Sequence, residues 1–127
     1  MIRPGMIDHV SLQVADVVRS RLFYQTLLAP IGLRAAYTDG DAVGFADEER
    51  APFWILPTSR ADDRELHIAF SAASRDVVRR FRDAAFALGA EILHEPRLFP
   101  EYGRDYYGCF VRDPDGHNVE AVCRIEE

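Results

Sequence analysis

The sequence is poor in cysteine, in positive charge and in long apolar runs, and each shortage excludes a class of protein. Its two cysteines, Cys109 and Cys123, have no C-x-x-C spacing, so neither a disulfide framework nor a zinc ribbon is indicated. The 15 Lys and Arg residues are outnumbered by 21 Asp and Glu residues, a formal charge of −6, which disfavours nucleic acid and membrane partners. No stretch approaches about 18 consecutive apolar residues, and residues 1–10 contain no apolar run followed by a small-residue cleavage site. We therefore expect a cytoplasmic protein.

The length and composition are those of one globular domain with a buried core. The chain has 127 residues, and domains cluster around ~100–150 residues. Apolar residues make up 48% of the chain and charged residues 28%, which is typical of soluble globular proteins. We predict a single domain over residues 1–127.

The chain contains two copies of one pattern. Residues 8–28 align with residues 66–86, which places His9 on His67. In each copy the histidine opens a strand with alternating apolar residues, and the histidine lies on the opposite face from them. A helix-capping residue and an amphipathic helix follow.

The predicted elements after these strands are also the same in both copies. Asp16 and Ser74 are the expected caps of helices of about thirteen residues. Turn signals, the clearest being the D-P-D-G turn at residues 113–116, then divide three β-prone runs in each copy. These runs are residues 33–37, 42–45 and 53–56 in the first copy, and 91–95, 106–111 and 118–122 in the second.

Each half therefore predicts a βαβββ module, at residues 7–57 and 65–123, with the polar segment 58–64 joining them. One such module cannot bury both faces of its sheet. We expect an α+β fold in which the two modules pair into a curved mixed sheet around a central cleft. An approximate twofold axis would bring His9 and His67 to equivalent places in that cleft.

Over residues 7–122 the chain resembles the vicinal oxygen chelate superfamily, which includes glyoxalase I, fosfomycin-resistance thiol transferases, bleomycin-resistance proteins and extradiol dioxygenases. The resemblance is carried by residues 7–12, 23–28 and, most specifically, 110–120, which read F-V-R-D-P-D-G-H-N-V-E. It implies that His9, His67 and Glu120 bind one divalent metal ion: Mn, Fe, Ni, Co or Zn. Two imidazoles and one carboxylate suit these metals and leave coordination positions open for a substrate.

One departure from glyoxalase I is visible in the first half. If Phe45 is aligned with Phe110, the position that repeats Glu120 is Ile55, beside Trp54, so the carboxylate of glyoxalase I is missing there. Glyoxalase I activity is thereby disfavoured, because that reaction resembles a proton transfer that needs a carboxylate base. The thiol transferases and dioxygenases are the closer analogues at the metal.

Each candidate ligand also has a purely structural interpretation. His9 and His67 resemble ordinary strand histidines when each is taken alone, and Glu120 resembles an exposed strand carboxylate. The recurrence of the two histidines at equivalent positions favours the metal site. His94 is predicted to be solvated, and His117 to lie at the surface or behind the ligands.

The aromatic segment at residues 98–108 is expected to form a loop over the cleft. Tyr102, Arg104 and Tyr107 are candidates for holding a planar or anionic substrate, and Trp54 for an apolar wall. Packing of these tyrosines against the other half is an equal alternative. Cys109 is predicted to be a small buried residue rather than a nucleophile.

These observations favour a metal-dependent enzyme acting on a small oxygen-chelating substrate, of the lyase, isomerase or thiol-transferase type. One alternative is a metal-free protein that sequesters a small molecule such as a drug. Another is an extradiol-type iron dioxygenase, although no further histidine is assigned as its acid or base. We expect a homodimer, in which the modules pair either within or between chains.

Overall fold

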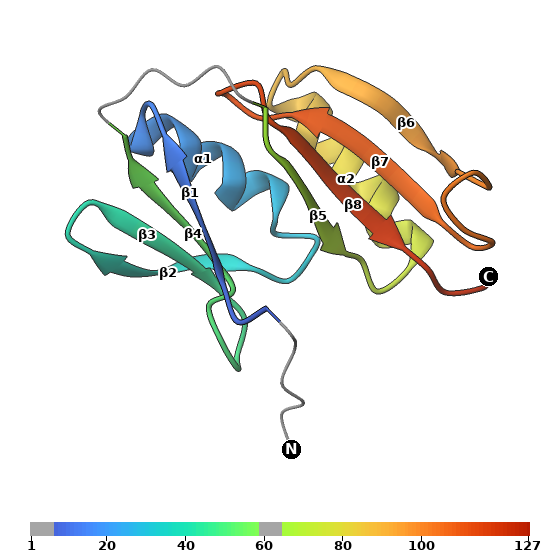
Figure 1. Cartoon of the computed structure of the whole chain (residues 1–127), viewed down its shortest axis with the longest axis horizontal. Helices are drawn as coiled ribbons and strands as arrows, with labels where there is room; N and C mark the ends of the chain where they lie inside the picture. The colour runs from blue at the N-terminus through green and yellow to red at the C-terminus, as the bar shows by residue number, and fades with distance from the viewer. Residues whose placement is uncertain (1–6, 59–64) are drawn as a thin grey trace.

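A computed structural model describes residues 7–58 and 65–127, which form two βαβββ modules (Figure 1). The first module contains β1 (Val10–Val14), α1 (Val17–Leu27), β2 (Arg34–Asp39), β3 (Ala42–Ala46) and β4 (Phe53–Pro57). The second contains β5 (His67–Ser71), α2 (Arg75–Ala87), β6 (Ile92–Leu98), β7 (Tyr107–Arg112) and β8 (Asn118–Cys123). The α+β class and the two modules are confirmed. Most of the predicted join, residues 59–64, lies outside the described residues.

Both helices begin where the sequence predicts. The Asp16 side chain accepts a hydrogen bond from the backbone N–H of Arg19 at 3.1 Å, and the Ser74 hydroxyl accepts one from Val77 at 3.2 Å. These bonds satisfy N–H groups that the first helical turn leaves without partners. Neither α1 nor α2 is long and apolar enough to span a membrane, and the same holds for every helix in the described ranges.

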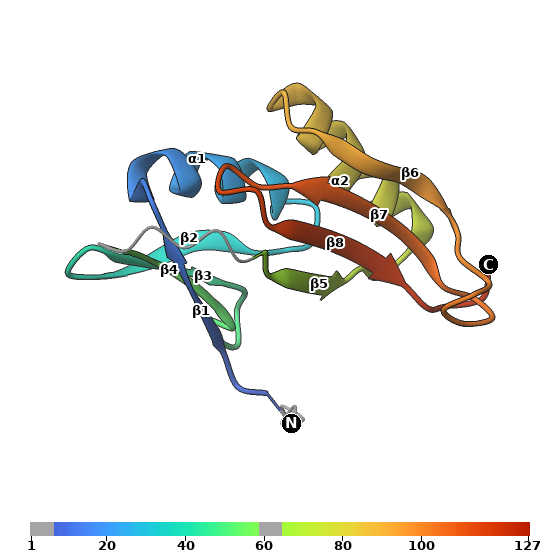
Figure 2. The same ribbon diagram turned by 45° about the horizontal axis from the view of Figure 1, so that its top comes forward.

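Each module has its own four-stranded mixed sheet, ordered β1-β4-β3-β2 in the first and β5-β8-β7-β6 in the second. In each, the edge strand that precedes the helix runs parallel to the last strand of the module, and the other neighbours are antiparallel. Within one chain the two sheets stay separate rather than forming one continuous sheet. Figure 2 shows α1 and α2 on one side of both sheets.

The two modules share one hydrophobic core on the helix side of their sheets. Phe53 of β4 and Phe70 of β5 meet across the boundary, with their ring centroids 5.2 Å apart. The Tyr24 hydroxyl of α1 donates to Asp113 Oδ2 at 2.6 Å, and the backbone N–H of Ala15 donates to Asp115 Oδ1 at 3.1 Å. The D-P-D-G turn therefore attaches the second module to the first. The opposite face of each sheet, called here the open face, carries the candidate site.

Candidate functional site

One row of residues crosses the open face of the second sheet. In register across β5, β8, β7 and β6 lie Ala69, Glu120, Phe110 and His94. His67 also faces this side, and its Nε2 lies 2.8 Å from Glu120 Oε1. The Glu120 side chain is 1% exposed and that of His67 is 52% exposed. The pair therefore joins a buried carboxylate to an imidazole that solvent can reach.

The second carboxylate oxygen of Glu120 is held by Tyr106, a residue that the sequence analysis missed. The buried Tyr106 hydroxyl donates to Glu120 Oε2, and the Arg124 guanidinium lies 4.6 Å from the centre of the Tyr106 ring. Burial raises the pKa of Tyr106 above its ordinary value, and the bond to Glu120 raises it further. The hydroxyl thus keeps its proton and acts as a donor. Counting alternate residues back from Phe110 would have identified this position.

Gly108 leaves room for this arrangement. A Cβ atom at this position would lie 3.3 Å from Glu120 Oε2 and 3.3 Å from a ring carbon of Tyr106. Both contacts are tighter than ordinary van der Waals distances. A side chain here would therefore push the carboxylate or the tyrosine out of place.

A second, smaller apolar cluster surrounds Glu120 on the open face, formed by Phe99, Tyr106, Phe110 and Val122. The His94 ring, although the residue is exposed, packs edge-on against Phe99 and Phe110, with centroids 5.6 and 5.3 Å away. His67 packs on the same Phe110 ring at 5.8 Å. The metal-binding candidates therefore lie in an aromatic setting, where polar interactions are stronger than in water.

His9 does not join His67 and Glu120 within one chain. It precedes β1, its side chain is 55% exposed, and its Nδ1 lies 2.8 Å from Asp8 Oδ1. In Figure 1, β1 starts at the lower end of the molecule whereas β5 starts at the upper end. Across residues 7–58 and 65–127, no three His, Cys, Asp or Glu residues form a group that could hold a metal ion. The structure thus brings together two of the three predicted ligands.

The equivalent row in the first module corrects one alignment. Across β1, β4, β3 and β2 this row consists of Ser11, Trp54, Gly44 and Tyr37. Trp54, not Ile55, therefore occupies the place of Glu120, because Ile55 faces the core and is 0% exposed. The error came from matching Phe45 to Phe110: Phe45 faces the helix side and Phe110 the open face. A shift of one residue along a strand exchanges its two faces. The first module still lacks a carboxylate at this place.

The remaining predicted substrate contacts lie on different sides of the sheet. Tyr102 is exposed beside the open face, where its ring stacks on Phe99 with centroids 5.6 Å apart. Arg104 is exposed in the same loop. Tyr107 instead packs on the helix side, where Arg75 and Arg79 lie over its ring at 5.3 and 5.9 Å.

Two residues near the site, His117 and Cys109, are buried in the fold. His117 is buried, and its Nδ1 accepts a hydrogen bond from the backbone N–H of Leu66 at 3.0 Å. Cys109 is 0% exposed on the helix side, where burial raises the pKa of its thiol to about 12. A protonated, enclosed thiol is a poor nucleophile, as the sequence predicted.

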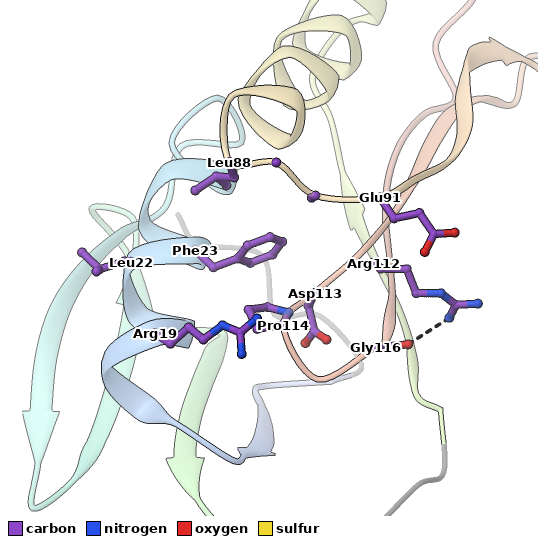
Figure 3. Close-up of a pocket in the computed structure, with 11 residues that line it drawn as sticks. Arg19, Leu22, Phe23, Leu88, Glu91, Arg112, Asp113, Pro114 and Gly116 are labelled. Carbon is purple, nitrogen blue, oxygen red and sulfur yellow. Dashed lines mark hydrogen bonds between the residues drawn. The ribbon is translucent and has the colours of Figure 1, made fainter.

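A pocket of about 490 Å³ lies on the helix side, between α1, the end of α2 and the D-P-D-G turn (Figure 3). Figure 3 shows Phe23 directed into it from α1, and Arg112 hydrogen-bonded to the carbonyl of Gly116, at 2.9 Å. Neither His67 nor Glu120 lines this pocket. It is therefore distinct from the row that carries the candidate ligands.

Comparisons with known proteins agree with the resemblance seen in the sequence. A crystal structure of a glyoxalase/bleomycin resistance protein from Albidiferax ferrireducens T118 is 25% identical, with a TM-score of 0.79 over 94% of this chain and 100% of that chain. The uncharacterized protein YqjT of Bacillus subtilis (strain 168) is 25% identical over 91% of this chain and 97% of its own length. A lactoylglutathione lyase from Agrobacterium tumefaciens, 22% identical, has the same fold, with a TM-score of 0.69 over 94% of both chains. The family model named Glyoxalase/Bleomycin resistance protein/Dioxygenase superfamily matches residues 6–121, and the chain belongs to this superfamily.

Proposed function

We propose that this protein is a metal-dependent enzyme acting on a small oxygen-chelating substrate, of the lyase, isomerase or thiol-transferase type. The observation that carries the proposal is the pair of His67 Nε2 and Glu120 Oε1, 2.8 Å apart on an open sheet face. Members of this family commonly bind a divalent metal. An imidazole nitrogen and a carboxylate oxygen are donors that Mn, Fe, Ni, Co and Zn all accept.

The surroundings of Glu120 fit a metal ligand. A fully buried carboxylate is costly unless charge or hydrogen bonds compensate it. Tyr106 satisfies Oε2, while among residues 7–58 and 65–127 the partner of Oε1 is the solvent-exposed His67 alone. A divalent ion at Oε1 would supply the missing charge, and Tyr106 would fix which oxygen faces that ion.

We propose that the third ligand is His9 from a second copy of the chain. β1 and β5 are both edge strands, so each offers unpaired backbone groups to another chain. Because the modules are repeats, β1 of one copy placed beside β5 of the other brings His9 toward His67 and Glu120. Twofold symmetry then produces two identical sites per dimer, each of which is incomplete in a single chain.

Different residues of the chain have different roles in this proposed site. A bound metal would polarise a substrate oxygen and stabilise the negative charge that develops on it. His67 and Glu120 hold the ion, Tyr106 fixes the carboxylate, and the aromatic cluster excludes water from one side. Trp54 stands where a glutamate base would be needed for glyoxalase I chemistry, so we favour reactions in which the attacking group comes from a second substrate, as in thiol transfer.

Metal content tests the proposal. Protein purified without chelator or metal-affinity resin is expected to hold near one ion per chain by mass spectrometry. His67→Ala and Glu120→Ala should lose it while their far-UV circular dichroism stays unchanged. His94→Ala, which removes an exposed histidine from the same sheet, is the matched control and should keep the ion. Absence of metal after reconstitution with all five candidate ions would overturn the proposal.

A heterodimer distinguishes a site that is shared between two chains from a site that is formed within one chain. His9→Ala and Glu120→Ala homodimers each lack one ligand in both sites and should be empty. A heterodimer of the two variants, isolated through different tags, regains one complete site if His9 acts between chains. One ion per heterodimer is therefore the expected result, and an empty heterodimer would contradict the shared site.

A second candidate is a metal-free protein that sequesters a planar small molecule. The observation favouring it is the exposed aromatic surface beside the open faces, where Tyr37 and Tyr102 are 55% and 59% exposed. Large exposed aromatic side chains often mark ligand or partner surfaces. Tight binding of an aromatic ligand by protein that takes up no metal would favour this candidate over the enzyme.

A further inference from the structure

The pocket on the helix side of the sheets, called here the helix-side pocket, lies at the boundary between the two modules. The first module contributes Arg19, Leu22 and Phe23 of α1, and the second contributes residues 88–91, 112–114 and 116. Its volume of about 490 Å³ falls in the range of ligand pockets, ~300–1,000 Å³, which often lie where two structural units meet. A ligand in this pocket would contact both modules.

The walls of the helix-side pocket are largely apolar. Figure 3 shows the Phe23 ring directed into the pocket, with Pro114 of the D-P-D-G turn below it. Leu22 lies beside Phe23 on α1 and is 61% exposed. A Cβ atom at Gly89 would meet no atom of the described residues within 4 Å, so the backbone after α2 borders open space. An apolar ligand would remove Leu22 from water, which favours binding.

Arg19 supplies an unpaired positive charge at the edge of this apolar space. It is exposed, and Figure 3 shows its side chain extending from α1 toward Pro114. In residues 7–58 and 65–127 the guanidinium has no hydrogen bond or ion pair, and only the backbone N–H of Arg19 is bonded, to Asp16. Arg112, by contrast, donates to Glu65 and to the carbonyl of Gly116. A guanidinium without a partner can bind a carboxylate through two parallel hydrogen bonds.

Two carboxylates of the lining limit the charge that a ligand can carry. Asp113 is 5% exposed, and its Oδ2 accepts from the Tyr24 hydroxyl at 2.6 Å. Its Oδ1 accepts from the backbone N–H groups of Asp115 and His117, at 2.9 and 2.8 Å. The Glu91 carboxylate points away from the centre of the pocket in Figure 3. Both negative charges remain near the ligand, so a group with one negative charge is favoured over a phosphate dianion.

We propose that the helix-side pocket binds a small carboxylate with an apolar body. The carboxylate pairs with Arg19, and the apolar body packs on Phe23 and Leu22. This second site lies on the other side of the second sheet from His67 and Glu120 and requires no metal. It therefore goes beyond the proposed function and is independent of it.

The test compares three probes in buffer with EDTA, so that no metal ion binds their oxygens. 3-Phenylpropionate has a ring and a carboxylate, 3-phenylpropionamide has the same shape without the charge, and propionate has no ring. 3-Phenylpropionate is expected to bind with a Kd of about 1 mM, ordinary for so small a ligand. The amide should bind about fivefold more weakly, the effect of one exposed ion pair, and propionate should also bind more weakly.

Backbone amide signals in ¹H–¹⁵N NMR spectra locate the probe and give its affinity. The signals of Gly89, Ala90 and Gly116, which line the pocket, should shift during the titration. The signal of Gly108 should stay in place, because Gly108 lies beside Glu120 on the open face. Shifts at Gly108 without shifts in the pocket would place the probe at the other site and overturn the proposal.

Two pairs of variants separate the charged contact from the apolar one. Arg19→Gln should give the carboxylate and the amide equal affinity, whereas Arg21→Gln, an exposed arginine of α1 outside the pocket, should keep the fivefold preference. Leu22→Ala should weaken both ring-containing probes. Val18→Ala is its control, because Val18 is 72% exposed on the same helix and does not line the pocket.

Three further results would overturn the proposal. One is the absence of any shift in the pocket, and another is a carboxylate preference that survives Arg19→Gln. The third is tighter binding of inorganic phosphate than of 3-phenylpropionate. None of these results bears on the metal site, because metal content is measured on separate samples without the probes.

Discussion

The two modules have the same backbone plan but opposite chemistry on their open faces. The row of the second module carries Glu120 and His94 around Phe110, whereas the equivalent row of the first carries Trp54 and Tyr37 around Gly44. On the helix side both modules contribute apolar residues to one core. Core packing therefore constrains the helix-side face of each sheet, whereas the open face carries a polar pair in the second module and two aromatic residues in the first.

The largest effect is expected in the shared core, at a matched pair of positions. Phe53 and Val119 hold equivalent places beside β1 and β5, and they are 1% and 0% exposed. Phe53→Ala should cost about 3–5 kcal/mol of unfolding free energy, because it leaves a large cavity at the module boundary. Val119→Ala removes less volume and should cost clearly less. Urea unfolding measures both, and equal losses would show that the boundary does not depend on Phe53.

A smaller effect is expected on the open face of the second module, where Tyr106 contacts Glu120. Tyr106→Phe removes the donor to Glu120 Oε2, and we expect it to weaken metal binding by about 10–100-fold, the range found for residues that orient metal ligands. Competition with a chelator of known affinity gives the value. Because its raised pKa keeps Tyr106 protonated, the difference between the two proteins should be constant from pH 6 to about pH 9. A wild-type affinity equal to that of Tyr106→Phe would remove Tyr106 from the site.

The smallest effect on stability is expected in the helices, at the equivalent positions Tyr24 of α1 and Arg82 of α2. Tyr24 of α1 donates to the buried Asp113, whereas Arg82 of α2 pairs with the exposed Glu95. Tyr24→Phe should lower the unfolding free energy by about 1–2 kcal/mol through the lost buried hydrogen bond. Arg82→Gln should make no measurable difference, because solvent screens its partner. A larger effect from Arg82→Gln would reverse the comparison.

The fold was predictable because its signals are local or repeated. Asp16 and Ser74 cap the helices as expected, and the D-P-D-G turn separates the last two strands. The repeat revealed the two modules before any element was assigned. Helix caps and turns depend on a few neighbouring residues, so sequence alone identifies them.

The candidate site was predictable only in part, because its geometry depends on long-range register. Matching Phe45 to Phe110 by residue type gave Ile55, and only strand pairing revealed Trp54 as the counterpart of Glu120. His67 and Glu120 meet because β5 and β8 are parallel neighbours, a pairing that the sequence analysis did not predict. The separation of His9 from them depends on how whole modules pack, and spacing along the chain does not contain that information.

The attachment of the D-P-D-G turn to α1 also has a consequence for how the molecule melts. Since Tyr24 and Ala15 hold Asp113 and Asp115, and one core spans both modules, neither module can open without exposing the other. Unfolding should therefore be a single cooperative transition. A ligand that binds to the second module should therefore raise the melting temperature of the first module as well. A calorimetric scan of the whole chain would then report whether the ligand is bound.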